Sequence, residues 1–394
     1  MKALIEEVKT QFIDRFRHNP QVYSQSPGRI NILGEHTDYT GGVSLPAAID
    51  CWTVAAWRQR TDHQIRIHTT SLSDSWETSW ADLEKPLDQQ WKKYVAGSAL
   101  LFKENQLSQE NPSGFELVLT GNIPLGKGLS SSAAVELTVL NGLNTLYKKD
   151  LSPLAMTQMA QQVEHRFLKV KSGLLDQFAC QFSQAGHALL IDFRTLKAQS
   201  VVMGAAFAQM AWLLVDSQVK RELASSKYSE RVDEYHTILK ILADGGHPGL
   251  RDLPLSEVDH VFAGHGANIL KRARHIVSEN ARTLKAVECL KAGDPENLGR
   301  LMNLTHESLA NDYEVSHPNL DHMVRFAKSV EGVYGGRMMG GGFGGCGLFL
   351  VKRSHAKSAG DKIAHDYLEK FNVKTDPRSY VFVDGASAWT ENGG

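Results

Sequence analysis

The sequence predicts a mixed α/β protein of two domains, and three observations lead to this fold class. The chain has 394 residues, more than one hydrophobic core usually organises. In the first half, the alternating run 115–120 is followed by a glycine-rich loop and then by apolar residues at helical spacing. The second half mixes further strands with amphipathic helices, which is α+β in character. We expect domains of 1–204 and 205–394, with the boundary close to 203–207.

The individual elements follow from the spacing of apolar residues along the chain. Helices are expected where apolar residues recur every three to four positions, at 4–17, 91–103, 133–147, 151–167, 220–242, 263–292 and 355–371. Strands are expected where residues alternate or stay apolar over a short run, at 30–33, 52–59, 64–68, 115–120, 187–193, 209–215, 346–351 and 380–383. The basic run 271–275 is interleaved with apolar residues, so we interpret it as an amphipathic surface helix rather than a nucleic-acid patch.

The composition excludes some classes of partner. Lys and Arg total 43 against 44 for Asp and Glu, so the chain has no overall field that would attract nucleic acid or an acidic membrane. No apolar run approaches the roughly 18 residues that a membrane span needs, and the acidic, amphipathic N-terminus is unlike a signal peptide. The four cysteines contain no C-x-x-C pair, which fits a reducing compartment. We therefore expect a cytoplasmic protein without nucleic-acid or membrane partners.

The glycine-rich loop at 126–132 is predicted to bind phosphate. It lies between a strand and the start of a helix, where serines are expected to cap the helix. The amides of such a loop and the unsatisfied amides of a helix start together form an anion site. An ordinary turn followed by an N-cap is the alternative.

Two familiar phosphate-binding motifs nearly match the sequence, and we reject both. Residues 121–127 have the form G-x-x-x-x-G-K, but Gly128 stands where a P-loop needs Ser or Thr. Residues 340–345 satisfy G-x-G-x-x-G, but an apolar run follows them rather than the helix that a Rossmann loop opens. This second glycine cluster would let backbone approach a ligand closely, or would simply make a tight turn between strands.

A dense polar group follows the first predicted strand. Glu35, His36, Thr37 and Asp38 are consecutive hydrogen-bonding side chains flanked by glycines. Such a loop suits a polyol, because each sugar hydroxyl needs a donor or acceptor in a fixed place. A solvated surface turn is the alternative.

Two further carboxylates differ in their sequence surroundings. Asp176 lies among apolar neighbours, which is unusual for a carboxylate unless it is paired or functional. A helix N-cap would also explain it. Glu164, taken alone, has the features of a solvated helix residue.

Three blocks of the chain, 27–42, 124–136 and 337–346, together resemble the three motifs of the GHMP small-molecule kinases. The first block, from Gly28-Arg29-Ile30-Asn31 through Gly34-Glu35-His36-Thr37-Asp38-Tyr39, is similar to the signature of the galactokinases. Segments 274–283 and 312–315 are also similar to galactokinase segments. The resemblance implies two α/β lobes with the active site between them. The N-terminal lobe would resemble ribosomal protein S5 domain 2, and the C-terminal lobe would be ferredoxin-like.

The resemblance also implies a reaction, ATP-dependent phosphorylation of the anomeric hydroxyl of galactose, and a role for each motif. Asp176 would be the general base, with Arg29 as its electrostatic partner near the transferred phosphoryl group. Ser132 and Glu164 would bind Mg²⁺. The ATP phosphates would be held by Gly126, Lys127, Gly128, Leu129, Ser130, Ser131 and Ser132. The sugar would be bound by Glu35, His36, Thr37, Asp38 and Tyr228, and by the backbone of Gly173. A monomer is expected.

The chain departs from the usual galactokinase pattern at several positions. Leu174 and Leu175 precede Asp176 where Ile and Met are usual, and we expect this apolar exchange to be harmless. Lys127 stands where relatives have a small residue, and its ammonium is expected either to touch a phosphate or to point to solvent. Residues 216–218 are Asp-Ser-Gln in place of Asn-Ser-Asn.

The departures leave two alternatives to galactose phosphorylation. The first is the same reaction on N-acetylgalactosamine, galacturonate or arabinose. The second is a catalytically silent sugar sensor, which is disfavoured because the serine-alanine part of the phosphate loop, residues 130–133, is intact.

Overall fold

The computed structural model describes residues 1–107, 112–219 and 224–391. Its strands are β1 (Val22–Leu33), β2 (Val43–Gln59), β3 (Gln64–Thr69), β4 (Asp74–Ser79), β5 (Phe115–Gly121), β6 (His187–Asp192), β7 (Lys197–Val202), β8 (Met210–Asp216), β9 (Val333–Met339), β10 (Cys346–Lys352), β11 (Arg378–Tyr380) and β12 (Ser387–Thr390). Within the described residues they form two sheets. The larger has the order β12-β1-β2-β5-β3-β4, with β6 and β7 joined through β2, and the smaller has the order β11-β8-β10-β9.

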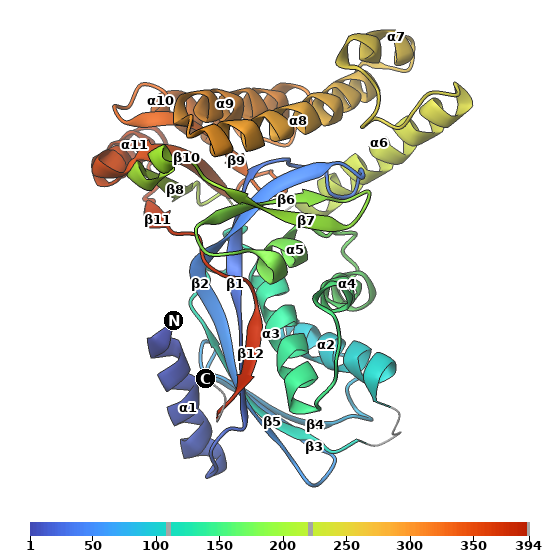
Figure 1. Ribbon diagram of the computed structural model, residues 1–394, viewed down its shortest axis with the longest axis vertical. Coiled ribbons are helices and arrows are strands. Elements are labelled where there is room, and N and C mark those ends of the chain that lie inside the picture. The colour runs from blue at the N-terminus through green and yellow to red at the C-terminus, as the bar shows by residue number, and fades with distance from the viewer. Residues whose placement is uncertain (108–111, 220–223, 392–394) are drawn as a thin grey trace.

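Helices cover both faces of the larger sheet. They are α1 (Lys2–Phe16), α2 (Gln90–Gln106), α3 (Ser131–Leu146), α4 (Pro153–Val163) and α5 (Leu175–Phe182), with a π-helical turn η1 (Glu164–Leu168) after α4. Side chains of β2 alternate between the faces, as expected for a strand. Val54 packs with Phe12 of α1, whereas Trp57 packs with Leu137 of α3. We call this sheet with α1–α5 the N-terminal lobe (Figure 1).

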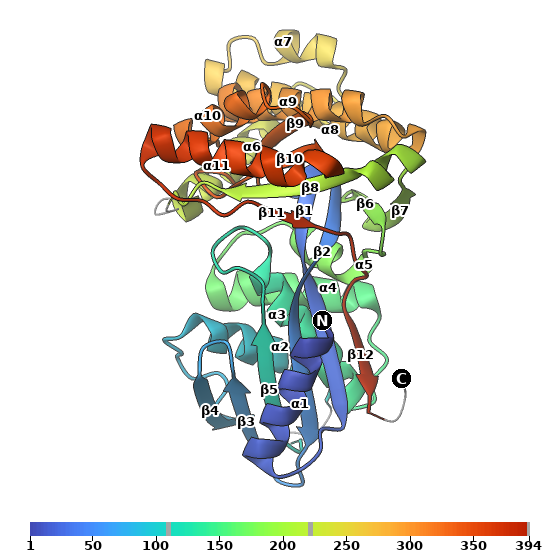
Figure 2. The same cartoon turned by 90° about the vertical axis from the view of Figure 1, so that its left-hand side faces the viewer.

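The smaller sheet carries the remaining helices, and we call this assembly the C-terminal lobe. They are α6 (Ala224–Asp244), α7 (Val258–Val261), α8 (Ala267–Ala292), α9 (Pro295–Asn311), α10 (Pro318–Ala327) and α11 (Ala356–Phe371), with 3₁₀ turns η2 (Ala205–Gln209), η3 (Leu255–Glu257) and η4 (Arg353–His355). The lobes lie one above the other in Figure 2, with β3 and β4 at the far end from α9. No helix of the described chain is both long and apolar enough to cross a membrane.

The two lobes share a hydrophobic core. Ile30 and Ile32 of β1 belong to the same buried cluster as Leu348 and Leu350 of β10 and Met302 of α9. The ends of β1 and β2 therefore reach into the C-terminal lobe, as Figure 2 shows. The loop between these strands is thereby fixed at the junction of the lobes, next to the glycine loop that joins β9 to β10.

The predicted fold class is confirmed, and so are most of the predicted elements. The strands at 30–33 and 52–59 are pieces of longer strands. Residues 22–27 were missed because polar side chains at 24–26 interrupt the apolar ones, although every position of the strand is buried. The strand at 380–383 is wrong, since β11 ends at Tyr380 and Phe382 makes only an isolated bridge to Ile49. Part of the helix predicted at 220–242 lies outside the described residues.

The interpretation of the basic run as an amphipathic helix is confirmed, because it lies in α8 with its cations paired. Arg272 is buried and contacts Glu234 and Glu314, with N–O distances of 2.9 and 2.8 Å. Arg274 pairs with Asp259 at 2.6 Å. The domain boundary near residue 204 remains a proposal. It separates the strands of the two sheets except for β12, which returns to the edge of the larger one.

Candidate active site

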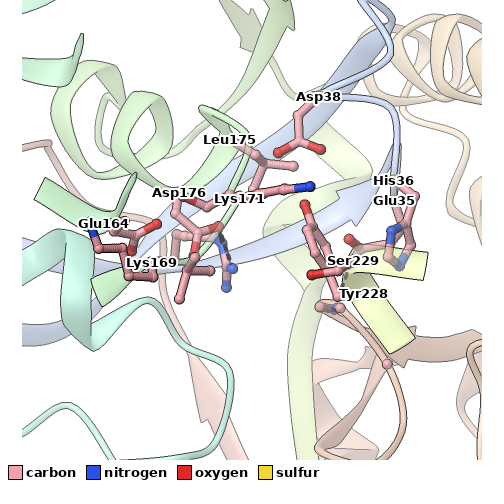
Figure 3. A pocket seen from close by; sticks show the side chains of 17 residues that line it. Glu35, His36, Asp38, Glu164, Lys169, Lys171, Leu175, Asp176, Tyr228 and Ser229 are labelled. Atoms are coloured by element: carbon pink, nitrogen blue, oxygen red, sulfur yellow. Dashed lines mark hydrogen bonds and ion pairs between the residues drawn. The ribbon is translucent and has the colours of Figure 1, made fainter. Parts of the chain in front are cut away.

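Two pockets adjoin at the junction of the lobes. The first has a volume of about 330 Å³ and the second about 810 Å³. Both are lined by Arg29, Asp176, Gly340 and Gly341. Figure 3 shows the first pocket, with Asp176 on one side and His36 and Tyr228 on the other. A ligand in each pocket would meet the other at Asp176.

Arg29 connects Asp176 to the glycine-rich loop. Its Nε and Nη2 donate to Asp176 Oδ1 at 2.8 and 2.5 Å, and its Nη1 donates to the Gly128 carbonyl at 2.6 Å. Asp176 lies in the first turn of α5, and Leu174 occupies the N-cap position, so the N-cap explanation of Asp176 is wrong. Both Arg29 bonds use Oδ1, so Oδ2 takes no part in the pair. Paired by a buried arginine and yet 32% exposed, this carboxylate is oriented and accessible.

The polar loop after β1 is held by charged groups of the C-terminal lobe. Glu35 Oε1 lies 2.7 Å from Arg337 Nη2 and accepts the Gly340 amide at 2.7 Å. Glu279 of α8 accepts the amide of Gly34 at 2.7 Å. Burial is the largest single influence and would raise the pKa of Glu279, but several neighbours, with Arg282 first among them, together outweigh it and the pKa falls to about 2. Neither Glu279 nor Arg337 was among the predicted site residues, although both lie in segments that resemble the family.

His36 and Thr37 have different places in this loop. His36 Nδ1 bonds the Tyr39 hydroxyl at 3.0 Å, while its buried Nε2 has no partner among the described residues. Burial lowers the pKa of His36 to about 4, so its imidazole is neutral at pH 7. Thr37 Oγ1 instead lies 2.9 Å from the Gly34 carbonyl oxygen and 2.8 Å from that of Val43, so its one proton is used there, and Thr37 does not line the first pocket. His36 is therefore available to a ligand, whereas Thr37 shapes the loop.

Asp38 and Gly173 face each other in the first pocket. A methyl group on Gly173 would come within 1.8 Å of Asp38 Oδ2, so only glycine allows this approach. Burial, with Asp176 as the next cause, raises the pKa of Asp38 to about 7. Tyr228 of α6 lines the same pocket, with its ring centroid 5.6 Å from that of His36.

The raised pKa of Asp38 predicts a pH-dependent stability. The folded-state pKa of about 7 exceeds the ordinary aspartate value of 3.8, so ionisation of Asp38 costs folding free energy as the pH rises from about 4 to 7. Asp38→Asn cannot ionise. We expect it to raise the melting temperature of the free protein by about 2–5 °C at pH 8 and hardly at pH 4, measured by thermal denaturation. An equal gain at both pH values would contradict the assignment.

The glycine-rich loop leaves the start of α3 open. Gly126 and Gly128 have φ of 72° and 73°, the left-handed region that glycine adopts without strain. Ser130 is the N-cap residue with φ of 61°, but its side chain accepts no capping hydrogen bond. A serine does occupy the N-cap position as predicted, but the expected cap by its side chain is wrong. The first amides of α3 lack a side-chain partner and can bind an anion.

Ser132 lines the second pocket and Glu164 lines the first, and their side chains meet between the two. Ser132 Oγ donates to Glu164 Oε1 at 3.0 Å. Glu164 is buried in the turn η1, so the interpretation of a solvated helix residue is wrong. Burial, more than any neighbouring group, raises the pKa of Glu164. Among the described residues there is no cluster of three or more His, Cys, Asp or Glu that could hold a metal ion.

Comparisons with known proteins match most of the chain. The galactokinase galactose-binding signature matches residues 10–59, the GHMP kinases N terminal domain residues 93–184, and the GHMP kinases C terminal domain residues 286–369. The galactokinase of Roseiflexus sp. (strain RS-1) is 35% identical over 385 residues, covering 97% of this chain and 95% of the relative. The galactokinase of Homo sapiens is 37% identical over 372 residues, covering 92% of each.

Solved structures agree with these matches. The crystal structure of Lactococcus lactis galactokinase complexed with galactose has a TM-score of 0.90 at 33% identity, covering 98% of this chain and 99% of that one. The mevalonate kinase of Methanococcus jannaschii has a TM-score of 0.65 at 18% identity, a likeness of fold alone.

Proposed function

Because the chain belongs to the galactokinases of the GHMP kinase family, we propose that it transfers the γ-phosphoryl group of ATP to the anomeric hydroxyl of α-D-galactose. The products are α-D-galactose 1-phosphate and ADP. The observation that carries this proposal is the pair of adjoining pockets that meet at Asp176 and Arg29. One has charged side chains in its lining and a size suited to a small molecule, and the other is lined by a loop suited to phosphates.

The first pocket supplies the groups that a sugar needs. The unpartnered Nε2 of His36 and the carboxylates of Glu35 and Asp38 can each bond a hydroxyl. Tyr228 contributes an aromatic face, and Gly173 contributes backbone beside Asp38. We propose that Thr37 acts indirectly, because its hydroxyl is used within the loop.

We propose that Asp176 acts as the general base. It would accept the proton of the anomeric hydroxyl as that oxygen bonds to the γ-phosphorus and the bond to the ADP oxygen breaks. Arg29 fixes the carboxylate through Oδ1 and the phosphate loop through Gly128, so one side chain sets the distance between base and phosphates. The positive charge of the Arg29 guanidinium also stabilises the negative charge on the transferred phosphoryl group.

The residues present fit a magnesium ion. Mg²⁺ prefers oxygen ligands and keeps several waters, so one hydroxyl and one carboxylate suffice. Ser132 and Glu164 offer these two groups at the edge of the phosphate loop, and a cation would offset the cost of burying Glu164 ionised. When bound, the ion would neutralise charge on the ATP phosphates.

We expect Glu279 to position the polar loop after β1 without touching the sugar itself. Glu279→Gln keeps the shape but gives up the charge that binds the Gly34 amide and Arg282. We expect the KM for galactose to rise about tenfold, with a smaller change in kcat and in the KM for ATP, corresponding to roughly 1.4 kcal/mol. Steady-state kinetics with each substrate varied will measure this. A larger rise in the KM for ATP than for galactose would contradict the role.

A sugar panel tests the proposed substrate. Purified protein with ATP and Mg²⁺ should release ADP with galactose at a higher kcat/KM than with N-acetylgalactosamine, galacturonate or arabinose. A different sugar ranking first would overturn the choice of galactose but not the reaction. ADP and galactose binding without turnover would instead indicate a sensor.

We also propose a cell compartment and an oligomeric state for the enzyme. We propose a cytoplasmic enzyme, which is consistent with four cysteines that are all free thiols. A monomer is proposed as well, and light scattering coupled to size-exclusion chromatography measures it.

A further inference from the structure

An ion pair joins the two lobes at the mouth of the second pocket. Lys127, between the two glycines of the phosphate loop, contacts Asp216 at the end of β8 through Nζ and Oδ2. The Lys127 side chain is 31% exposed and that of Asp216 is 13% exposed. The neighbouring backbone is also linked across the lobes, since Cys346 Sγ donates to the Lys127 carbonyl at 3.2 Å. The loop is thus tied to the C-terminal lobe at this residue.

The charges of this pocket are balanced before any ligand enters. Among the described residues that line it, the charged side chains are Arg29, Lys127, Asp176 and Asp216, two of each sign. Arg29 is committed to Asp176 and to the Gly128 carbonyl. Lys127 is therefore the described lining cation that can move to a polyphosphate, and Asp216 is the anion that competes for it.

Lysine is suited to such an exchange. Its ammonium is a compact charge on a flexible four-carbon stem, so it can change partners without a fixed geometry. Partly exposed ion pairs are weak because water screens them. Phosphate oxygens carry more charge than one carboxylate, so they can displace Asp216 from Lys127.

We propose that Lys127 binds the phosphates of the nucleotide and that Asp216 pairs with its ammonium until a nucleotide is bound. In the free enzyme the ammonium pairs with Asp216, and when a nucleotide enters, the ammonium turns to its phosphates and the contact between the lobes opens. Asp216 thereby weakens nucleotide affinity, which favours release of ADP after turnover. The proposal rests on the proposed function, because it requires that nucleotide phosphates occupy this pocket.

The test is a double-mutant cycle on ADP binding, measured by titration calorimetry in the presence of Mg²⁺. Asp216→Asn frees the ammonium, so we expect the Kd for ADP to fall about fivefold, whereas Lys127→Ala should raise it about tenfold. In the Lys127→Ala background the gain from Asp216→Asn should shrink, because there is no ammonium left to release. An equal gain in both backgrounds would mean simple repulsion by Asp216 and would overturn the proposal.

The controls separate this effect from a change in the net charge of the protein and from misfolding of a variant. Lys357→Ala and Asp361→Asn break an exposed ion pair on α11 and should leave the Kd for ADP as in the wild type. If Asp216→Asn weakened ADP binding, or left it as it was, the pair would be structural and the proposal would be overturned. Should Asp216→Asn fail to fold, Lys127→Gln gives the deciding result, since an unaltered Kd would overturn the proposal. Wild-type protein that bound no ADP would overturn the proposed function as well.

Discussion

Asp176→Asn is expected to lower the kcat for galactose phosphorylation by about 10³-fold, within the range that a general base contributes. The substitution keeps the shape of the side chain and leaves an oxygen to accept from Arg29, but the amide cannot take the proton of the sugar. Binding of ADP and the melting temperature should change little, since Asp176 is 32% exposed and its partner Arg29 remains. A coupled assay for ADP release, with calorimetry of ADP binding, measures both.

The N-terminal lobe offers a matched control for this variant. Asp62 accepts from Arg60 Nε and Nη2 at 2.7 and 2.6 Å, so Asp62→Asn alters another arginine–aspartate pair outside both pockets. Asp62→Asn should retain the wild-type kcat. If Asp176→Asn kept more than about a tenth of the wild-type kcat, Asp176 would not be the base.

Arg29→Lys is expected to lower kcat by about 10²-fold, the loss seen when one preorganised donor to a transition state is removed. Lysine keeps the charge but cannot donate at once to Asp176 and to the Gly128 carbonyl. The distance between the base and the phosphate loop would then no longer be fixed. We also expect weaker ADP binding, because the loop loses its anchor.

Arg60→Lys is the matched control for Arg29→Lys. Arg60 contacts both Asp62 and Glu116, each at 2.6 Å, and so makes the same type of forked contact in the same lobe. It should leave kcat at the wild-type value. An Arg29→Lys enzyme as active as the Arg60→Lys enzyme would show that the fork on Asp176 and Gly128 is dispensable.

Local patterns in the sequence were enough for the motifs and for part of the elements, but they missed several strands and helices, α9 and β9 among them, and could not show partners that are distant in the chain. Asp176 could be singled out because a carboxylate among apolar residues is unusual unless it is paired or functional. Its pairing with Arg29 could not be seen in any local pattern, because that residue lies 147 positions away. Glu164 gave no such signal, because most residues around it are polar and its partner Ser132 lies 32 positions away. Periodicity also could not show that the helix ends in a π-helical turn there.

The contacts between lobes were the least visible from sequence. Glu279 accepts a hydrogen bond from the Gly34 amide although the two residues are 245 positions apart. Lys127 pairs with Asp216, which is 89 positions away. Both depend on how the lobes pack through Ile30, Ile32 and the strand β10, and no window along the chain contains that information. The structure thus explains the unusual lysine in the phosphate loop, because Lys127 forms an ion pair with Asp216.

A crystal structure with galactose and a non-hydrolysable ATP analogue tests the arrangement most directly. The sugar should lie against Glu35, His36 and Asp38, with its anomeric oxygen within about 3 Å of Asp176, a hydrogen-bonding distance. The γ-phosphate should lie on the opposite side of that oxygen, next to the loop that carries Ser132. An anomeric oxygen directed away from Asp176, or phosphates bound outside the second pocket, would contradict the proposed mechanism.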